Sequence, residues 1–482
     1  MLAYVMRSGS GDDGVDAGAT MIRIFSHYIP IRTLFLVALE TLVLVLSIHF
    51  GLALSGLSPD PAGPQTPAVA STVAMLAVFI LTTMTAMGLY DSEVREAVGV
   101  TLLRLLLAFV LGLVLSGLAI TLVPSLTLGP NALMTAFSVA LVGSVVTRLV
   151  VVGWITPHAF QRRVLVLGTG SRAASVEDLV RGKDDCVKIV GYLPTQPAQN
   201  HVDTGRILAR TESLVEAVKR HRVNEIVIAV RDRRGGVLPV QELLECRLRG
   251  IAVTDLASFF ERERCQLHLE SLNMSWMIFG EGFRQGFVRE TVKRLFDVAT
   301  SAALVLLTLP IMLVAAICIY FEDGGPVLYR QERVGQGGRV FTIFKFRSMR
   351  DDAERDGRPR WAGANDDRMT AVGRIIRKLR VDELPQILNV LRGDMSFVGP
   401  RPERPFFVEQ LASKIPYYAA RHSIKPGITG WAQVRYPYGA SLDDAVEKLQ
   451  YDLYYVKNHT LFLDIMVLIE TVQVVLWGKG AR

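Results

Sequence analysis

Four long apolar runs in the first third of the chain constrain its fold more than any other feature. The chain has 482 residues, and the runs cover roughly residues 33–56, 67–89, 101–124 and 131–155. A helix needs about 20 residues to cross ~30 Å of hydrocarbon, so each run is long enough to span a bilayer. Core helices of water-soluble proteins are rarely this long and this poor in charge. The runs therefore predict four transmembrane helices within residues 31–158.

The charges around these runs predict how they are oriented. Lys or Arg occurs before the first run, between the second and third, and after the fourth, whereas the loops 57–66 and 125–130 contain neither. Positively charged loops stay in the cytoplasm. Both ends of the bundle should therefore lie on the cytoplasmic side of the inner (plasma) membrane. Arg104 and Arg148 each lie near one end of a run, where a long side chain can snorkel to the interface.

The termini and the net charge add two further expectations. Residues 1–30 begin with a Gly- and Asp-rich stretch before a second methionine, Met21, which could be the true start, and they predict a disordered segment. The net charge of +7 fits attachment to an anionic lipid leaflet. Basic charge also suits nucleic acid, but the membrane spans argue against that partner.

Residues 163–275 have the texture of an α/β domain. A buried strand at 164–167 is followed by a glycine turn and a helix, and strands are expected at 187–193, 225–230 and 250–254. Helices expected at 211–221 and 239–248 lie between them. This alternation predicts a parallel, Rossmann-like sheet on the cytoplasmic side.

The glycine turn of this domain, Gly168-Thr169-Gly170, resembles a dinucleotide-binding fingerprint. Gly168 and Gly170 are its candidate cofactor-binding residues, but the acidic ribose partner expected after the second strand is missing, as is a catalytic Tyr/Lys dyad. Three interpretations stay open: bound NAD, a nucleotide-sugar or other anion at the helix N-terminus, and a structural or regulatory role. No redox cofactor is expected.

A fifth apolar run, residues 298–321, is long enough to span a membrane but has Pro310 at its middle. Proline removes a backbone hydrogen bond and kinks a helix. Both flanks of the run are basic, whereas a spanning helix should show an asymmetry of charge. We therefore expect a bent, re-entrant helix over about 297–321 that enters the membrane and returns to the same side.

The chemistry of the chain concentrates at Asp382-Glu383, which lies between basic residues and is followed by Pro400-Arg401-Pro402. A carboxylate pair can supply one oxygen as a nucleophile and others as ligands for a hard cation. The nearby arginines suit a phosphate. A simpler alternative is that Asp382 caps a helix with Glu383 in its first turn. The two interpretations are compatible, because the helix dipole keeps such a carboxylate ionised.

Basic residues elsewhere in this region favour the first interpretation. Lys345 and Arg347 have the same parity on a predicted strand and so face one side. Arg374 and Arg377 share one face of a predicted helix. A solvated strand edge and a solvated helix face are the alternatives. Beside a carboxylate pair, these cations indicate metal-assisted phosphoryl transfer.

Residues 290–482 resemble the bacterial sugar transferase domain of the monotopic phosphoglycosyl transferases. The matching motifs include Lys293-Arg-x-x-Asp297, Phe344–Met349, Asp382–Gln386, Gly393–Ser396, Val398–Pro402 and Lys425–Gln433. With four membrane helices and a Rossmann-like domain in front, the whole chain resembles the large, exopolysaccharide-priming members. The stretch Met21–Pro30 resembles most the subgroup linked to exosortase-type clusters. One departure is Leu309-Pro310, where many relatives have Ser-Pro, so the missing hydroxyl could come only from Thr308.

The resemblance implies that a sugar-1-phosphate moves from a UDP-sugar to polyprenyl (undecaprenyl) phosphate with release of UMP, the first step of exopolysaccharide or other surface glycan synthesis. It makes Asp382 the nucleophile of a covalent aspartyl-phosphosugar and Glu383 the ligand of Mg²⁺. It also implies a homodimer. Further residues match phosphate- or substrate-contacting motif positions: Lys345, Arg347, Arg377, Arg401 and Asp394.

Two other functions compete with this one. A nucleotide-sugar oxidoreductase could be built on the Gly168 turn, and a membrane scaffold without catalysis could assist polysaccharide assembly. The first lacks its ribose-binding acid and its dyad. The second leaves the carboxylates and cations around Asp382 unexplained.

Overall fold

The computed structural model of the chain describes residues 21–55, 66–90, 98–122, 129–154, 161–181, 187–195, 201–208, 213–230, 238–272, 282, 286–350, 368–436, 439 and 441–477. It has two compact units. The first comprises Met1–Ile24 and Tyr28–Arg264, and the second comprises Phe25–His27 and Cys265–Arg482. The predictions for residues 1–20 and for most of the loops between the apolar runs lie outside the described residues.

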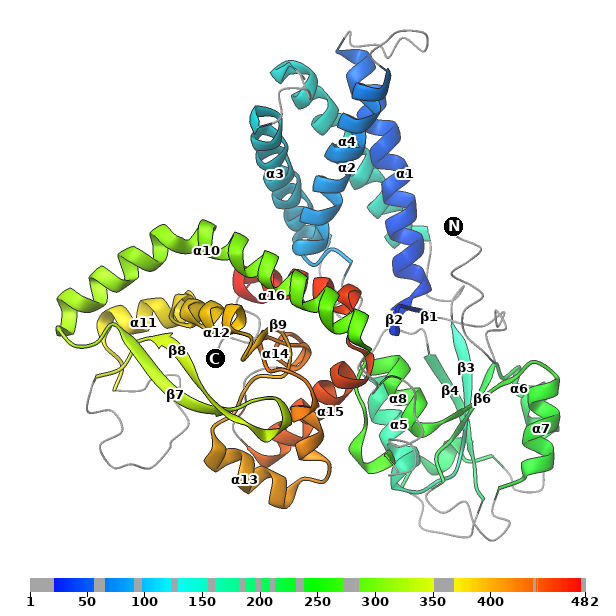
Figure 1. Cartoon of the computed structure of the whole chain (residues 1–482). Coiled ribbons are helices and arrows are strands. Elements are labelled where there is room, and N and C mark those ends of the chain that lie inside the picture. The colour runs from blue at the N-terminus through cyan, green and yellow to red at the C-terminus, as the bar shows by residue number, and fades with distance from the viewer. Residues whose placement is uncertain are drawn as a thin grey trace. The chain divides into compact units, whose positions relative to one another are not determined.

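The four apolar runs of the first unit are helices, as predicted. They are α1 (Ile31–Leu54), α2 (Thr66–Ala86), α3 (Val98–Leu122) and α4 (Pro130–Trp154), which lie side by side (Figure 1). By length and composition α1, α3 and α4 can each cross a membrane, and the described apolar part of α2, Ala70–Ala86, is shorter. Disorder was expected for residues 1–30. Within this segment, β1 (Met21–Ile24) and β2 (His27–Pro30) instead form a two-stranded sheet.

The expectation that Arg148 snorkels is wrong, because its guanidinium pairs with Glu40 of α1 inside the bundle. Nε of Arg148 lies 2.8 Å from Oε1 of Glu40, and Nη2 donates to Oε2 at 3.1 Å. The hydroxyl of Tyr90 donates to the same carboxylate at 2.5 Å. Glu40 is fully buried and Arg148 is 7% exposed. The bundle therefore contains a buried ion pair that satisfies an otherwise costly charge.

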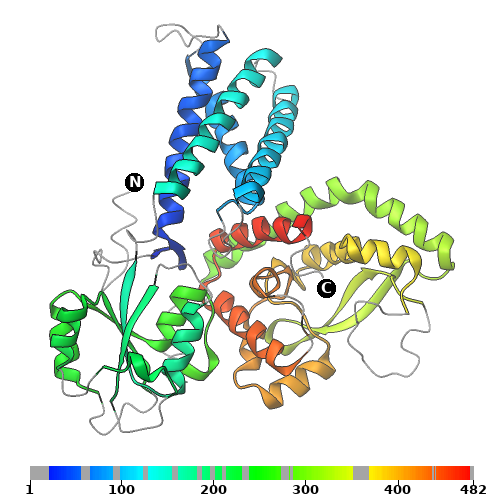
Figure 2. The same cartoon turned by 180° about the vertical axis from the view of Figure 1, so that it is seen from behind.

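The α/β domain of the first unit has a four-stranded parallel sheet in the order β4-β3-β5-β6, which confirms the predicted parallel sheet. Val164 and Val166 face the helices α5 and α8, whereas Leu165 and Leu167 face α6 and α7, so both faces of the sheet are covered (Figure 2). The elements are β3 (Arg162–Leu167), α5 (Ser171–Arg181), β4 (Val187–Leu193), the 3₁₀ turn η2 (Thr204–Arg206), α6 (Leu214–His221), β5 (Glu225–Ile228), α7 (Val240–Leu248), β6 (Ala252–Asp255) and α8 (Leu256–Arg264).

The second unit combines one very long helix with short strands and helices. Its strands form an antiparallel pair, β7 with β8, and a parallel pair, β9 with β10. The elements are η3 (Leu269–Ser271), α10 (Phe287–Asp323), β7 (Leu328–Val334), η4 (Gln336–Gly338), β8 (Val340–Phe346), α11 (Ala371–Lys378), η5 (Val381–Gln386), α12 (Ile387–Arg392), β9 (Ser396–Val398), α13 (Pro405–Lys414), η6 (Tyr418–Ser423), β10 (Gly427–Thr429), α14 (Trp431–Arg435), α15 (Leu442–Asn458) and α16 (Leu461–Trp477).

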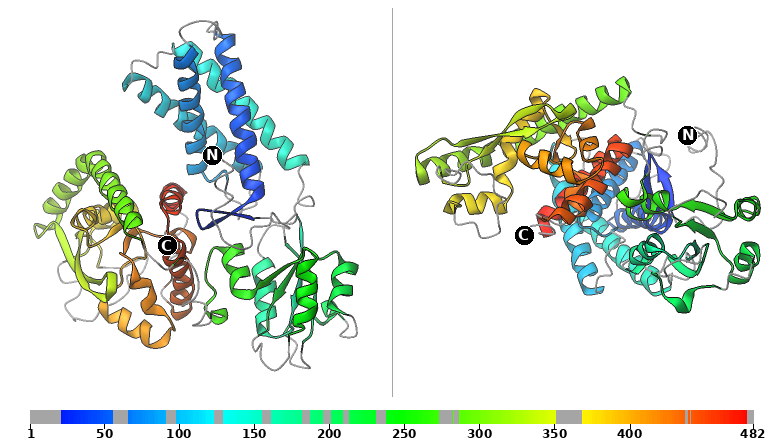
Figure 3. Two further views of the ribbon diagram at one scale, coloured as in Figure 1. Left: turned by 45° about the vertical axis from the view of Figure 1, so that its right-hand side comes forward. Right: turned by 90° about the horizontal axis from the view of Figure 1, so that it is seen from below.

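The long helix α10 is continuous through Pro310 and visibly bent (Figures 1 and 3). Both of its ends pack on this unit. Near its start, Asp297 accepts hydrogen bonds from the Ser396 hydroxyl and the Phe397 amide, each at 3.0 Å. Near its end, Ala315 and Ile319 join a buried cluster with Phe346 and Ile376.

The segment of α10 around Pro310 exposes large apolar side chains, such as Leu306 at 79% and Leu307 at 76%. Thr308 donates its hydroxyl to the carbonyl of Leu304 at 2.7 Å. It therefore does not supply the hydroxyl for the Leu306 carbonyl, which is the one that Pro310 leaves without a helical donor.

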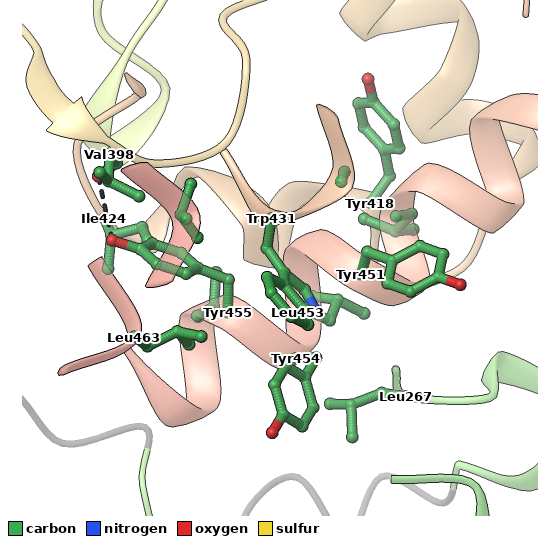
Figure 4. Close-up of a cluster of buried hydrophobic side chains, with 14 of the residues drawn as sticks. Leu267, Val398, Tyr418, Ile424, Trp431, Tyr451, Leu453, Tyr454, Tyr455 and Leu463 are labelled. Carbon is green, nitrogen blue, oxygen red and sulfur yellow. Dashed lines mark hydrogen bonds between the residues drawn. The ribbon is translucent and has the colours of Figure 1, made fainter. Parts of the chain in front are cut away.

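The main core of the second unit lies around Trp431 (Figure 4). Tyr454 stacks on the Trp431 ring, and Tyr455 donates to the carbonyl of Val398 at 3.0 Å. His27 belongs to this unit, and its Nδ1 lies 2.9 Å from the Tyr454 hydroxyl. This core fixes β9 and β10, and β9 leads directly into the Pro400-Arg401-Pro402 segment.

Candidate active site

The carboxylate pair lies in the first turn of η5, a 3₁₀ turn that continues into α12. Arg380 occupies the N-cap position with a φ of +57°, which turns the chain sharply from the end of α11 into η5. Asp382 is thus inside the turn and is not the capping residue of the simpler alternative. Asp382 and Glu383 are 8% and 9% exposed. The turn presents two nearly buried acids at a helix N-terminus, where the dipole favours negative charge.

Two cations hold Glu383. Lys345 of β8 places Nζ 3.1 Å from Oε1, and Arg401 places Nη2 2.6 Å from Oε1 and Nη1 3.4 Å from Oε2. Burial alone would raise the pKa of Glu383, but the charges of Arg401 and Lys345 outweigh it and hold this pKa well below its ordinary value. Glu383 is therefore ionised and engaged at both oxygens.

Asp382 has the opposite electrostatic environment. Burial and the neighbouring charge of Glu383 raise its pKa to about 6, against the lowering effects of Lys345, Arg377 and Arg401. Arg377 comes from the last turn of α11. At neutral pH most Asp382 side chains are still ionised, and a carboxylate with a raised pKa is a better nucleophile than one that is tightly paired. The two acids are thus suited to different tasks.

Asn389 fixes the register between the acids and Lys345. It is fully buried in α12, where its side chain accepts from the Phe344 amide at 3.1 Å and donates to the Thr342 carbonyl at 2.7 Å. These two bonds fasten α12 to β8, one residue before Lys345. A polar residue among the apolar positions of a short helix is the sequence signal for this role.

The structure brings Lys345, Arg377 and Arg401 to the acids, but it places the other two predicted residues differently. Arg347 follows the end of β8 and is 3.5 Å from Asp323 at the end of α10. Asp394 is exposed in the turn after α12. Among the described residues, no hydrogen bond or ion pair joins Arg347 or Asp394 to the carboxylate pair.

The glycine turn of the first unit has the strand–turn–helix context that was predicted. Gly168 has a φ of +122°, and an added Cβ would lie 3.2 Å from the Ala229 carbonyl oxygen, so its glycine is required by the backbone. Gly170 precedes α5, and the space around its missing Cβ is open. The backbone therefore accounts for Gly168, whereas the role of Gly170 stays a prediction.

Comparisons with known proteins match both parts of the chain. Residues 288–478 match the family described as bacterial sugar transferase, and residues 85–236 match the CoA-binding domain family. The chain is 48% identical over 191 residues to the UDP-N-acetylgalactosamine-undecaprenyl-phosphate N-acetylgalactosaminephosphotransferase of Aeromonas hydrophila, an alignment that covers 40% of this chain and 45% of the relative. The chain thus spans less than half the length of that relative.

Two further relatives are named UDP-glucose:undecaprenyl-phosphate glucose-1-phosphate transferase. The one from Caulobacter vibrioides is 44% identical over 193 residues, which are 39% of this chain and 71% of the relative. The one from Escherichia coli is 30% identical over 327 residues, which are 66% of this chain and 69% of the relative. The latter alignment extends well beyond the residues around Asp382.

Proposed function

The chain belongs to the bacterial sugar transferase family, and from this premise we propose that it transfers a sugar-1-phosphate from a UDP-sugar to undecaprenyl phosphate and releases UMP. The observation that carries the proposal is the buried Asp382–Glu383 pair, with Lys345 and Arg401 on Glu383 and Arg377 close enough to influence Asp382. Three cations around two acids suit a diphosphate substrate better than a helix cap.

Asp382 is the nucleophile in the proposed reaction. One of its carboxylate oxygens attacks the phosphorus that bears the sugar, the bond from that phosphorus to UMP breaks, and UMP leaves with the electron pair. The product is a covalent aspartyl-phosphosugar. An oxygen of the lipid phosphate then attacks the same phosphorus, and the bond to Asp382 breaks to restore the carboxylate. Such a sequence predicts ping-pong kinetics.

The contacts of Glu383 support the choice of Asp382 as the nucleophile. Its oxygens already accept from Lys345 and Arg401, whereas Asp382 has a raised pKa and forms no ion pair with another described residue. When the donor binds, Lys345 and Arg401 are placed to exchange part of their interaction with Glu383 for the diphosphate oxygens. They would then stabilise the charge that develops as UMP departs.

Mg²⁺ fits this donor set. Among the described residues, no group of three or more His, Cys, Asp or Glu could form a protein cage for a metal. Mg²⁺ does not need one, because it is bound by one or two carboxylates together with substrate phosphates. Glu383 would hold it, together with the phosphate oxygens of the donor. The bound ion would neutralise the diphosphate and ease the departure of UMP.

The long helix α10 provides the proposed attachment to the membrane surface. Its 37 residues correspond to about 55 Å of helix, far more than ~30 Å of hydrocarbon. Both ends pack on the same unit, through Asp297 at one end and Ile319 at the other, while the middle exposes leucines. A helix held at both ends by one domain can dip into a leaflet and return, and this re-entrant path would keep Asp382 at the depth of the lipid phosphate.

Labelling of single cysteines tests this placement. Cysteines introduced at Glu290, before the apolar segment, and at Glu332, after it, should both react from the cytoplasmic side of sealed vesicles. Reaction of the two from opposite sides would mean that α10 spans the bilayer. The homodimer and the exosortase-linked subgroup stay predictions.

Membranes that contain the chain test the reaction itself when supplied with undecaprenyl phosphate, Mg²⁺ and a panel of donors that starts with UDP-glucose and UDP-N-acetylgalactosamine. We expect UMP release without added NAD. Asp382→Asn should abolish it, whereas Asp178→Asn, a matched change at an exposed acid of α5, should retain most of it. Undiminished release from Asp382→Asn would refute the nucleophile. Release that depends on NAD would favour the oxidoreductase.

A further inference from the structure

We propose that Arg421 and Asp452 form a positioning pair that holds the backbone of Arg401 and so aims the Arg401 guanidinium at Glu383. Neither residue was singled out by the motifs of the sequence, and Asp452 lies on α15, far along the chain from the acids. This inference deepens the proposed function and rests on it. The pair itself touches no reacting atom.

The segment that carries Arg401 is fixed through its carbonyl groups. Four successive carbonyls, of residues 400–403, each accept a hydrogen bond. The donors are the Gly427 amide at 3.0 Å, Nη2 of Arg421 at 2.9 Å, Nη1 of Arg333 at 3.0 Å and the Val334 amide at 2.9 Å. Pro400 and Pro402 have no N–H and a fixed φ. Carbonyl contacts are therefore the main means by which neighbouring elements can hold this segment.

The bond from Arg421 falls on the carbonyl of Arg401 itself. Three further bonds fix the guanidinium: Nε and Nη2 donate to Oδ2 of Asp452 at 3.0 and 2.7 Å, and Nη1 donates to the Tyr418 hydroxyl at 2.9 Å. Arg421 is 6% exposed and Asp452 is 3% exposed. A planar guanidinium with donors on three sides has one orientation here, and a lysine ammonium could not reproduce it.

The hydrogen bond from Arg421 affects the site because the Arg401 carbonyl and the Arg401 guanidinium are parts of one residue. The Arg401 carbonyl belongs to the same residue whose guanidinium lies 2.6 Å from Glu383. If the carbonyl loses its donor, the backbone can rotate and the far end of a long side chain moves more than the backbone does. A misplacement of about 1 Å in such a group can cost ~10²-fold in rate. Arg421 would thus act on the reaction only through Arg401.

A purely structural role is the competing explanation, since a buried ion pair also affects folding. A double-mutant cycle separates the two. Arg421→Lys is measured in the wild-type background and in an Arg401→Gln background, with kcat and the donor KM obtained from UMP release. We expect Arg421→Lys to lower kcat/KM by at least about 10-fold in the first background and by less than about 2-fold in the second. An equal factor in both backgrounds would overturn the positioning role.

Arg435→Lys is the matched control. It alters another ion pair of the same unit, in which Nη2 of Arg435 lies 2.5 Å from Oε1 of Glu470. Its factor should be the same in both backgrounds. If Arg421→Lys does not fold, Tyr418→Phe removes a single bond to Arg421 and enters the same cycle, with the same criterion.

The cycle can also be read by thermal unfolding in detergent, which requires no activity. The fall in Tm for the double variant should be smaller than the two separate falls together, because Arg401 loses its fixed contact in either single variant. Strict additivity would refute the inference even if no donor is turned over. Failure of the wild-type chain to release UMP would instead refute the proposed function.

Discussion

Replacing Gly373 by alanine should destabilise the protein, although the same substitution usually stabilises a helix. In an open helix the change stabilises by roughly 1 kcal/mol. Gly373 lies in α11, where an added Cβ would be 2.1 Å from the carbonyl oxygen of Ser348 and 2.7 Å from Oγ1 of Thr370, the N-cap residue. Ordinary contact begins at 3.4 Å. Either α11 or the chain after β8 must therefore move by about 1 Å.

The magnitude follows from these contacts. Overpacking of this kind costs roughly 1–3 kcal/mol, and a disturbed N-cap adds up to about 1 kcal/mol, which roughly cancels the gain of about 1 kcal/mol in helix propensity. We expect the free energy of unfolding of Gly373→Ala to fall by roughly 1–3 kcal/mol, the sign opposite to propensity. Because α11 carries Arg377 and leads into Asp382, UMP release should fall by about 10²-fold.

Urea or thermal unfolding in detergent and UMP release provide the two readings. Gly99→Ala in the first turn of α3 is the matched control, since nothing lies within 4 Å of its added Cβ, and it should not lower stability. If Gly373→Ala were as stable and as active as the wild-type chain, the close packing of α11 on residue 348 would be wrong.

The remaining predictions concern buried charges and the metal. Arg148→Met leaves the Glu40 carboxylate buried without its partner and should lower the free energy of unfolding in detergent by about 3–5 kcal/mol. Adding Glu40→Leu should restore part of this free energy. Equal stability of the single and double variants would contradict the buried pair. Burial lowers the pKa of His459 to about 4 from 6.5. The contribution of the neutral imidazole to the free energy of unfolding is therefore complete above pH 6.5 and is lost as the pH falls towards 4. His459→Gln should make the decline in Tm over that pH range less steep. Glu383→Gln, like chelation of Mg²⁺, should reduce UMP release by about 10²-fold or more, and full activity in excess chelator would exclude the metal.

The sequence predicted those parts of the fold that depend on local pattern. Apolar length placed α1–α4, and the alternation of strand and helix gave the parallel sheet around β3. Contacts between residues far apart in the chain could not be predicted from these patterns. The snorkelling predicted for Arg148 failed because its partner Glu40 lies 108 residues earlier, and no local signal links the two. The ordered position of His27 was not predicted because its partners, Trp431 and Tyr454, lie about 400 residues later in the chain.

The same distinction holds at the site. Motif resemblance identified Asp382, Glu383 and Lys345, and the structure brings them together. Arg347 directly follows β8, and its guanidinium lies 3.5 Å from Asp323 of α10, so its contact with the substrate stays a prediction. Arg421 was missed because its target is a backbone carbonyl 20 residues away, a contact that residue types alone do not encode.

The most direct test of the central claim is the mass of the protein after incubation with a UDP-sugar and Mg²⁺ in the absence of undecaprenyl phosphate. The account predicts an increase equal to one sugar-phosphate group, located on the peptide that contains Asp382 and discharged when the lipid phosphate is added. Asp382→Asn should show no adduct. An adduct on another residue, or steady UMP release with no adduct in rapidly quenched samples, would contradict the assignment of Asp382 as the nucleophile.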